Sequence, residues 1–413
     1  MFQKLLHAAL DRLVVLGRLT VRYPDGTRRS YGREPGPEAA FAIRHPAALR
    51  RLVLNPALAF GEHYMDGMVE PEGCTIADVL HLLVLNNYRG GRHPAEALLA
   101  RWRRARRRLD QRNAIARAKR NVAHHYDLSG RLYSLFLDRD RQYSCAYFPT
   151  GTETLEEAQA LKKRHIAAKL RLDRPGLDVL DIGSGWGGMA ITLARDFGAR
   201  VTGITLSQEQ LAASRRRAAE AGVADRVRFE LVDYRTWDRP VDRIVSVGMF
   251  EHVGIGNYAT FFRKVRDALK PDGVALIHAI GMMEGPASIN PWMAKYIFPG
   301  AYCPALSEIM PAIERAGLWV TDLEILRLHY ALTLAEWRRR FAANRDAIQS
   351  LYDERFCRMF EFYLAGCEMA FRVGDHMNWQ VQLTRDKAVL PLTRDWMMEA
   401  ERAAPSHARL AAE

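Results

Sequence analysis

The chain has 413 residues, 48% of them hydrophobic, and a formal net charge of +12 at neutral pH. This length and apolar content are enough for a substantial core and favour two domains. No apolar run approaches the roughly 18 residues of a membrane-spanning helix, and the first residues lack a signal-peptide cleavage pattern. The expected location is therefore the cytoplasm.

The cysteines indicate neither a disulfide framework nor a zinc site, because they are odd in number, scattered and never arranged as CxxC. We expect reduced thiols and no bound metal. The five are Cys74, Cys145, Cys303, Cys357 and Cys367.

The positive charge is concentrated between Arg101 and Arg120, where ten basic residues surround a single acid, Asp110. Such a run is either a solvated helix or linker, or a patch that docks on the anionic surface of a membrane. Trp102 within the run suits an interface. A nucleic-acid partner is disfavoured, because the run lacks the interleaved aromatic residues of a base-stacking platform.

The N-terminal segment predicts a small α/β domain. Residues 1–20 place apolar side chains on one face at helical spacing, which favours a helix packed on its own domain's core over one inserted in a membrane. Residues 19–32 alternate apolar and polar residues around Asp25-Gly26, a dipeptide typical of a two-residue hairpin turn. We assign residues 1–100 to this domain, 101–120 to a basic linker and 121–413 to a second domain.

The second domain alternates helices with short apolar strands. Thr154 and Glu157 form a predicted capping box at the start of a helix. Strand and helix alternating in this way predicts a mostly parallel sheet with helices on both faces, whose ligands bind at the carboxyl ends of the strands. The predicted strands are 177–182, 199–205, 227–232, 242–247 and 273–279.

A glycine-rich turn follows the first of these strands. Gly183, Gly185 and Gly187 would let the backbone turn sharply and approach a nucleoside closely. The spacing alone also fits dinucleotide binding. Two features disfavour dinucleotide binding. Asp181 precedes the turn, where a carboxylate can meet the positive end of an amino-acid-bearing ligand. The second strand ends in Thr205 and lacks the acid expected of a nicotinamide enzyme.

The glycine turn, the strand ending in Thr205 and the segment Leu269–Gly273 together resemble the class I S-adenosylmethionine methyltransferases. The resemblance implies a Rossmann-like α/β fold and S-adenosylmethionine as the cofactor. It further implies that Thr205, Leu206 and Gln210 approach the cofactor. Asp233 and Tyr234 would flank its adenine, although an aromatic residue there could equally be loop packing.

Several further segments resemble the cyclopropane-fatty-acyl-phospholipid synthase family. The family usually has a small polar pair where this chain has Gly130-Arg131, which affects the expected loop shape. The resemblance implies an N-terminal lipid-binding domain, a homodimer and peripheral attachment to the inner face of an anionic membrane. It also implies cofactor contacts from Tyr143 and Ser144. The segments are residues 61–67, 124–128, 142–148, 249–252, 277–280 and 371–385.

The implied reaction adds a methylene group to the double bond of an unsaturated phospholipid acyl chain. The enzyme must align the alkene with the sulfonium methyl group, exclude water and provide a base that removes a proton so that the ring closes. By resemblance that base is a bicarbonate ion. Its expected ligands are Cys145, Glu251, His278, the backbone of Ile280, and Tyr330.

Each assignment has a structural alternative. Cys145 could be an ordinary buried thiol, and His278 a core histidine with satisfied hydrogen bonds. Glu251 is harder to explain by packing, because a carboxylate seldom follows an apolar strand without a reason. Cys367 matches a family cysteine sometimes considered catalytic, but an alkene offers a thiol no electrophilic centre. We therefore favour a packing role and keep Cys367 as the weakest of the candidate catalytic residues, after Cys145, Glu251, His278 and Tyr330.

Aromatic residues are frequent on the helical stretches near the C-terminus. Packing is the expected role for most, and a few could line an acyl tunnel or stabilise a carbocation. They are Phe341, Phe356, Phe360, Phe362, Tyr363 and Phe371.

Two other functions stay open at this stage. One is a methyltransferase that leaves a branched or methylene-bearing chain, or that acts on another substrate such as a small amine. The other is a non-catalytic basic protein that binds membranes or nucleic acid.

Overall fold

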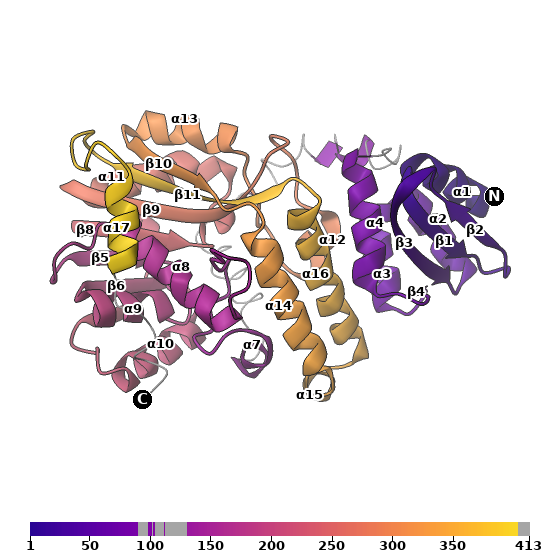
Figure 1. Ribbon diagram of the computed structural model, residues 1–413, viewed down its shortest axis with the longest axis horizontal. Coiled ribbons are helices and arrows are strands. Elements are labelled where there is room, and N and C mark those ends of the chain that lie inside the picture. Colours follow the sequence, from indigo (N-terminus) through magenta and orange to yellow (C-terminus); the bar gives the residue numbers. More distant parts are fainter. Residues whose placement is uncertain (90–97, 101, 104–110, 112–129, 404–413) are drawn as a thin grey trace. The chain divides into compact units, whose positions relative to one another are not determined.

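The computed structural model describes residues 1–89, 98–100, 102–103, 111 and 130–403 (Figure 1). The chain divides into two compact units. The first comprises residues 1–110, 286–299 and 330–376, and the second comprises residues 111–285, 300–329 and 377–413.

The first unit takes in two segments, 286–299 and 330–376, that the sequence assigned to the second domain. The reason is helix packing, since α16 (Glu354–Arg372) packs against α4 (Ile76–Arg89) and α3 (Pro56–Met65). The predicted linker lies mostly outside the described residues, so its boundaries stay predictions.

The first unit contains a four-stranded sheet with the order β2-β1-β3-β4. β1 runs antiparallel to β2 and parallel to β3, and β3 runs antiparallel to β4. The strands are β1 (Leu16–Arg22), β2 (Arg28–Tyr31), β3 (Glu34–Ile43) and β4 (Val69–Pro71). The remaining helices of this unit are α1 (Phe2–Leu13), α2 (Pro46–Leu54), α12 (Pro291–Tyr296), α14 (His329–Ala343) and α15 (Arg345–Leu351).

The hairpin predicted around Asp25-Gly26 is confirmed, but its turn is longer than expected. The amide of Tyr23 donates to the carbonyl of Thr27 at 2.8 Å, which leaves three residues in the turn. Gly26 takes a φ of 83°, as the left-handed position of a three-residue turn requires. The Asp25 carboxylate accepts from the amide and hydroxyl of Thr27, at 3.0 and 2.6 Å, and stabilises this form.

The N-terminal helix α1 is shorter than the predicted 1–20, because Leu16 already belongs to β1. Leu6 and Leu10 are buried in the core of the first unit. The apolar face that the spacing predicts includes Leu5, Leu6 and Ala9; Leu6 and Ala9 are buried, whereas Leu5 is 47% exposed. The expected core-packing role of this helix is therefore confirmed for part of the predicted face.

The C-terminal aromatic residues pack as expected. The rings of Phe341 on α14 and Phe360 on α16 stack with centroids 5.1 Å apart. Phe360 also meets Tyr363 edge-on at 5.2 Å. Phe371 is buried against Tyr330 at 4.8 Å. These contacts join the two long helices of the first unit.

The second unit contains a seven-stranded sheet with the order β10-β11-β9-β8-β5-β6-β7. The five strands from β5 to β9 run parallel, whereas β10 and β11 pair antiparallel with each other. The five predicted strands are confirmed, and β10 and β11 were not predicted as strands. The strands are β5 (Asp178–Ile182), β6 (Arg200–Thr205), β7 (Val227–Leu231), β8 (Val241–Val247), β9 (Leu269–Met282), β10 (Trp319–Ile325) and β11 (His376–Thr384).

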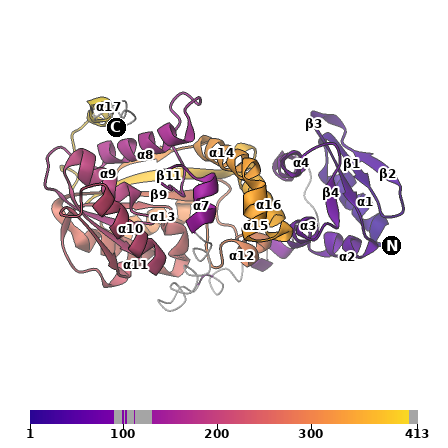
Figure 2. The ribbon, with the colours of Figure 1, turned by 90° about the horizontal axis from the view of Figure 1, so that it is seen from below.

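Helices cover both faces of this sheet, as predicted. Because side chains alternate along a strand, Leu180 packs with Phe261 on one face while Val179 packs with Ile166 on the other. Figure 2 shows α8 and α11 on opposite sides of β9 and β11. The helices are α7 (Gly130–Phe136), α8 (Leu155–Lys169), α9 (Gly188–Phe197), α10 (Gln208–Glu220), α11 (Tyr258–Ala268), α13 (Leu306–Ala316) and α17 (Asp395–Ala403).

The predicted capping box at the start of α8 is present. The amide of Glu157 donates to the Thr154 hydroxyl at 3.3 Å, and the amide of Thr154 donates to the Glu157 carboxylate at 2.9 Å. Within the described ranges, no helix is both long and apolar enough to span a bilayer.

Candidate active site

The glycine-rich turn connects β5 to α9 at the carboxyl end of the sheet. The amides of Gly183 and Ser184 both donate to the carbonyl of Ile204 on β6, at 2.9 and 3.0 Å. These bonds fix the start of the turn against the neighbouring strand. Gly187, with a φ of 83°, precedes the first residue of α9.

Close packing explains two of the three predicted glycines. A Cβ on Gly183 would lie 2.7 Å from Cγ of Met249, and one on Gly187 would lie 2.8 Å from Cζ of Phe229. Gly185 differs, because an added Cβ would meet no atom within 4 Å in the described part of the chain. No described residue therefore packs on the backbone at Gly185, which suits the close approach of a nucleoside.

Asp181 lies one residue before the end of β5 and is 2% exposed. Its Oδ2 has no hydrogen-bond partner among the described residues. Burial raises the pKa of this carboxyl to about 7, against the attraction of Lys162. A buried carboxylate oxygen beside a glycine turn suits the ammonium group of an amino-acid-bearing ligand, so these residues fit S-adenosylmethionine.

Thr205 and Gln210 meet at the end of β6. The Thr205 hydroxyl donates to Oε1 of Gln210 at 2.9 Å, and the amide of Gln210 donates to Ser207 at the start of α10. Both side chains are buried. The structure brings these two predicted cofactor residues together with Leu206 between them in sequence, and their contact with the cofactor stays a prediction.

Asp233 and Tyr234 follow β7 in a short 3-10 helix. Both oxygens of Asp233 accept from the guanidinium of Arg235, at 2.8 and 2.6 Å. The Tyr234 ring meets Phe261 edge-on at 5.3 Å, which is the loop-packing alternative considered for it. The adenine contact proposed for both residues stays a prediction.

The segment that carries Tyr143, Ser144 and Cys145 is held by a buried lysine. Lys162 of α8 is 0% exposed and donates to the Oε1 of Gln142 at 2.7 Å and to the Ser144 hydroxyl at 3.0 Å. Burial lowers the pKa of this lysine to about 8. Tyr143 packs edge-on against aromatic rings of α7, and Cys145 is 1% exposed.

Sequence reasoning missed Lys162. The available signal was its place on α8, where it shares a helical row with the apolar residues Leu155, Ala158 and Ile166. A lysine in such a row points toward the core, where it needs specific partners if it is buried.

Glu251 and Ile280 are joined by a hydrogen bond. Oε1 of Glu251 accepts from the amide of Ile280 at 2.7 Å, which connects the loop after β8 to the end of β9. Oε2 is buried with no partner among the described residues. Burial raises the pKa of Glu251 to about 7.

His278 lies on β9, two residues before Ile280, and is 1% exposed. Burial, with a smaller contribution from Lys162, lowers its pKa to about 3, so the ring is neutral. Its Nδ1 lies 3.1 Å from Nε2 of Gln380 and its Nε2 lies 3.4 Å from Nδ2 of Asn378. Both amides come from β11 and were missed by sequence reasoning.

Tyr330 and Cys367 belong to the first unit. Tyr330 is the second residue of α14, after His329, and its ring contacts Trp337 at 5.7 Å as well as Phe371. Cys367 lies on α16, and burial raises its pKa to about 12, so it is a thiol at neutral pH. His124–Leu128, which carries part of the family resemblance, lies outside the described residues.

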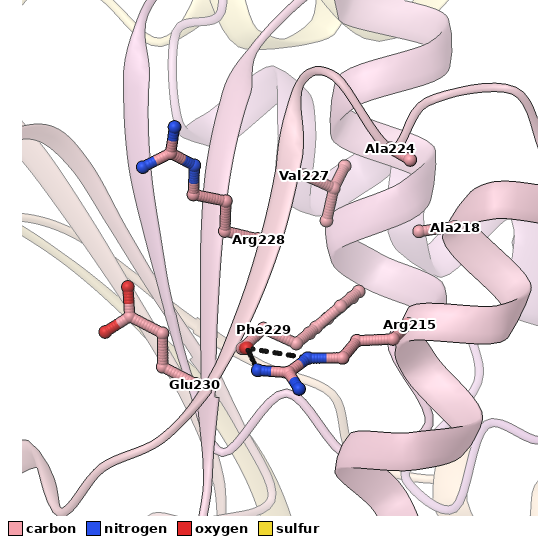
Figure 3. A pocket seen from close by; sticks show the side chains of 7 residues that line it. All are labelled: Arg215, Ala218, Ala224, Val227, Arg228, Phe229 and Glu230. Atoms are coloured by element: carbon pink, nitrogen blue, oxygen red, sulfur yellow. Dashed lines mark hydrogen bonds between the residues drawn. The ribbon is translucent and has the colours of Figure 1, made fainter.

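A hollow lies between β7 and α10, and none of the predicted site residues lines it (Figure 3). The guanidinium of Arg215 donates to the carbonyl of Phe229 at 2.8 Å across it. This hydrogen bond already gives the Arg215 guanidinium a partner within the hollow, so we assign the hollow no role.

Comparison with known proteins identifies the family to which the chain belongs. Residues 113–381 match the family model of mycolic acid cyclopropane synthetase, and residues 5–89 match a model described as a domain of unknown function. The chain is 38% identical to cyclopropane-fatty-acyl-phospholipid synthase of Escherichia coli K12, over 84% of this chain and 88% of that protein. It is 36% identical to a probable fatty acid methyltransferase of Pseudomonas putida, over 86% of this chain and 89% of that protein.

A solved structure supports the cofactor assignment. The mycolic acid cyclopropane synthase CmaA1, complexed with S-adenosylhomocysteine and CTAB, superposes with a TM-score of 0.61 at 34% identity. The match covers 64% of this chain and 97% of that one. The chain therefore belongs to the mycolic acid cyclopropane synthetase family of S-adenosylmethionine-dependent methyltransferases.

Proposed function

We propose that the protein adds a methylene group from S-adenosylmethionine to the cis double bond of an unsaturated phospholipid acyl chain and forms a cyclopropane ring. The name of the E. coli relative supports the phospholipid substrate. The observation that carries the proposal is Glu251, whose one oxygen is fixed by the amide of Ile280 while the other is buried and unpartnered in the described chain. A carboxyl group held in this way has one oxygen left to hydrogen-bond a small proton-accepting ion.

When bound, S-adenosylmethionine supplies an electrophilic methyl group and bicarbonate supplies a base. Asp181 would hold the ammonium end of the cofactor, and the Gly183–Gly187 turn would approach its nucleoside. Glu251, whose pKa of about 7 lets it carry a proton at neutral pH, would donate to an anion instead of repelling it. Cys145, His278, the backbone of Ile280, and Tyr330 are the other proposed ligands of the anion.

The balance of the reaction distinguishes a ring from a saturated methyl branch, which would need a reductant. The alkene π electrons form a new bond to the methyl carbon, and the sulfonium C–S bond breaks. A C–H bond of the new methyl group then breaks, its electrons close the ring, and the proton goes to the base. The lipid therefore gains one CH₂ group, and no oxidant or reductant is consumed.

Lipid analysis tests this proposal. Phospholipids from bacteria that express the chain should gain the mass of CH₂ per modified acyl chain, with ring protons in the NMR spectrum and a matching loss of alkene signals. Vinylidene protons, or a saturated methyl branch, would instead identify a methylene-bearing or branched product. The P. putida relative, by its name a probable fatty acid methyltransferase, is the reason to keep this second candidate.

We also propose that the basic run docks the enzyme on anionic membranes from the cytoplasmic side and that the enzyme is a homodimer. Each lysine or arginine near an anionic surface contributes about 1 kcal/mol. Pelleting with vesicles of graded anionic content should increase with that content, and a gel shift with RNA should show no binding at physiological salt. Light scattering would report the dimer.

A further inference from the structure

A layer of buried polar side chains lies between β11 and α8 in the second unit. On β11, alternate residues Asn378, Gln380 and Gln382 are 1%, 0% and 1% exposed. On α8, His165 and Lys169 are buried. Buried polar groups are costly unless each has a partner, so the bonds in this layer constrain one another.

Lys169 fixes the orientation of the Gln380 amide. The ammonium Nζ donates to Oε1 of Gln380 at 2.9 Å. An ammonium group has three donors and no acceptor, so Gln380 must present its carbonyl oxygen to Lys169. Its NH₂ group then faces the other way, toward Nδ1 of His278 at 3.1 Å.

Lys169 itself is anchored by acidic groups. It forms an ion pair with Glu324 on β10, and Oδ2 of Asp322 lies 3.6 Å away. Glu324 also contacts Nε2 of His165 at 2.7 Å. Although burial acts to raise the pKa of Glu324, His165 and Lys169 hold it well below its usual range, so Glu324 is ionised.

The amide orientation determines where His278 carries its hydrogen. An NH₂ group only donates, so Nδ1 of His278 must accept. A neutral imidazole has one hydrogen, which must then be on Nε2. We propose that Gln380, held by Lys169, is a positioning residue that fixes His278 as the neutral tautomer with its hydrogen on Nε2, ready to donate to an anion in the active site.

Asn378 fits this tautomer only with its amide turned from its orientation in the structure. In that orientation, its Nδ2 lies 3.4 Å from Nε2 of His278 and its Oδ1 has no hydrogen-bond partner in the described part of the chain. Both ring nitrogens of His278 then face NH₂ groups, although a neutral imidazole accepts at only one. With the amide turned so that Oδ1 faces the ring, that oxygen accepts the Nε2 hydrogen and is satisfied. The separation exceeds the usual ~2.9–3.0 Å of a strong N–H···O bond, so Asn378 holds this hydrogen weakly.

The role in catalysis rests on the proposed function, because it assumes that His278 binds bicarbonate. A hydrogen on Nε2 attracts an anion, whereas the other tautomer would present a lone pair there. The tautomer itself can be measured without any product being formed, so the two claims can fail separately.

The experiment uses the full chain labelled with ¹⁵N-histidine. Long-range ¹H–¹⁵N correlation spectra, with His278 assigned by its absence in His278→Asn, should show the Nε2–H tautomer in the unmodified protein. In Gln380→Glu the new carboxylate can only accept, so His278 should gain a hydrogen on Nδ1. An Nδ1–H tautomer in the unmodified protein would overturn the proposal.

Kinetics separate positioning from general damage. Gln380→Glu should lower kcat by about ten- to hundred-fold, the range seen when a partner that orients a ligating histidine is removed, and should raise the bicarbonate requirement. Its affinity for S-adenosylhomocysteine should stay within about twofold, which also shows that the variant is folded. Asn86→Asp is the matched control, because it changes an equally buried amide to a carboxylate in the first unit, where the side chain donates to the carbonyls of Leu16 and Leu82.

The control should keep the Nε2–H tautomer and most of its turnover. Unchanged turnover in a Gln380→Glu variant with an altered tautomer would remove the positioning role. If the unmodified protein makes no cyclopropane lipid yet shows the Nε2–H tautomer, the proposed function fails while the role of Gln380 on His278 stands.

Discussion

Oε1 of Glu251 accepts a hydrogen bond from the amide of Ile280 at 2.7 Å, while Oε2 is buried without a partner among the described residues. One oxygen therefore fixes the carboxyl group at the ends of two adjacent strands, β8 and β9, and the other is available to a ligand. This half-satisfied carboxyl group is the centre of the proposed base site.

Replacing Glu251 tests that site directly. Glu251→Gln keeps the size of the side chain and an oxygen for Ile280, but it removes the titratable proton. We expect affinity for S-adenosylhomocysteine to be retained and kcat to fall by about 10²- to 10⁴-fold. Glu230→Gln is the control, since Glu230 on β7 forms an ion pair with Arg239 and is not one of the predicted site residues. Full activity in Glu251→Gln would remove Glu251 from the mechanism.

We expect Asp181, which is proposed to bind the cofactor, to lower the free energy of unfolding of the ligand-free protein at neutral pH. Burial raises its pKa from 3.8 to about 7, so the folded protein keeps a proton that the unfolded chain releases. Stability is then lost as pH rises from about 4 to about 7, by up to about 4 kcal/mol.

Asp181→Asn removes this penalty. In urea unfolding at pH 8 without ligand, we expect the variant to be more stable than the unmodified protein, with the difference vanishing near pH 4. Affinity for S-adenosylhomocysteine should fall in the same variant, as measured by calorimetry. A constant difference at both pH values, or undiminished affinity, would contradict the role assigned to Asp181.

We expect Lys162 to support cofactor binding, because it holds the segment that carries Gln142 and Ser144. Lys162→Met removes the donors to Gln142 and Ser144, and we expect weaker binding of S-adenosylhomocysteine, by about tenfold for a loss of 1.4 kcal/mol. Lys270→Met is the control, because Lys270 binds Asp178 and Asp242 at the amino ends of β5 and β8. Equal affinities in the two variants would show that Lys162 has only a structural role.

Cys367 should be dispensable for chemistry. Its raised pKa keeps it a thiol rather than the nucleophilic thiolate. Cys367→Ala should retain turnover within about twofold, and its main effect should be on the stability of α16. Loss of turnover in a variant whose thermal unfolding is unchanged would restore a catalytic role for this cysteine.

Much of the second unit could be predicted from sequence because its signals are local. The apolar runs that became β5 to β9, the capping box at Thr154, and the glycines of the turn each follow from a few neighbouring residues. The hairpin at Asp25 was likewise predictable, but the length of its turn depended on the hydrogen bond between Tyr23 and Thr27.

The polar layer could not be predicted, because it depends on contacts between distant segments. In β11 the alternation of Asn378, Gln380 and Gln382 with apolar residues is typical of a strand with one solvated face. α8 covers that face instead and supplies Lys169 as a partner. The residues that orient His278 are therefore visible only in the folded chain.

Transfer of isotopic label from S-adenosylmethionine to lipid tests the central claim most directly. Purified enzyme is given S-adenosylmethionine labelled in its methyl group, oleoyl phospholipid vesicles and bicarbonate. The account predicts that the label appears in a cyclopropane ring of the lipid. No label in the lipid, from protein that binds S-adenosylhomocysteine and unfolds cooperatively, would contradict the account.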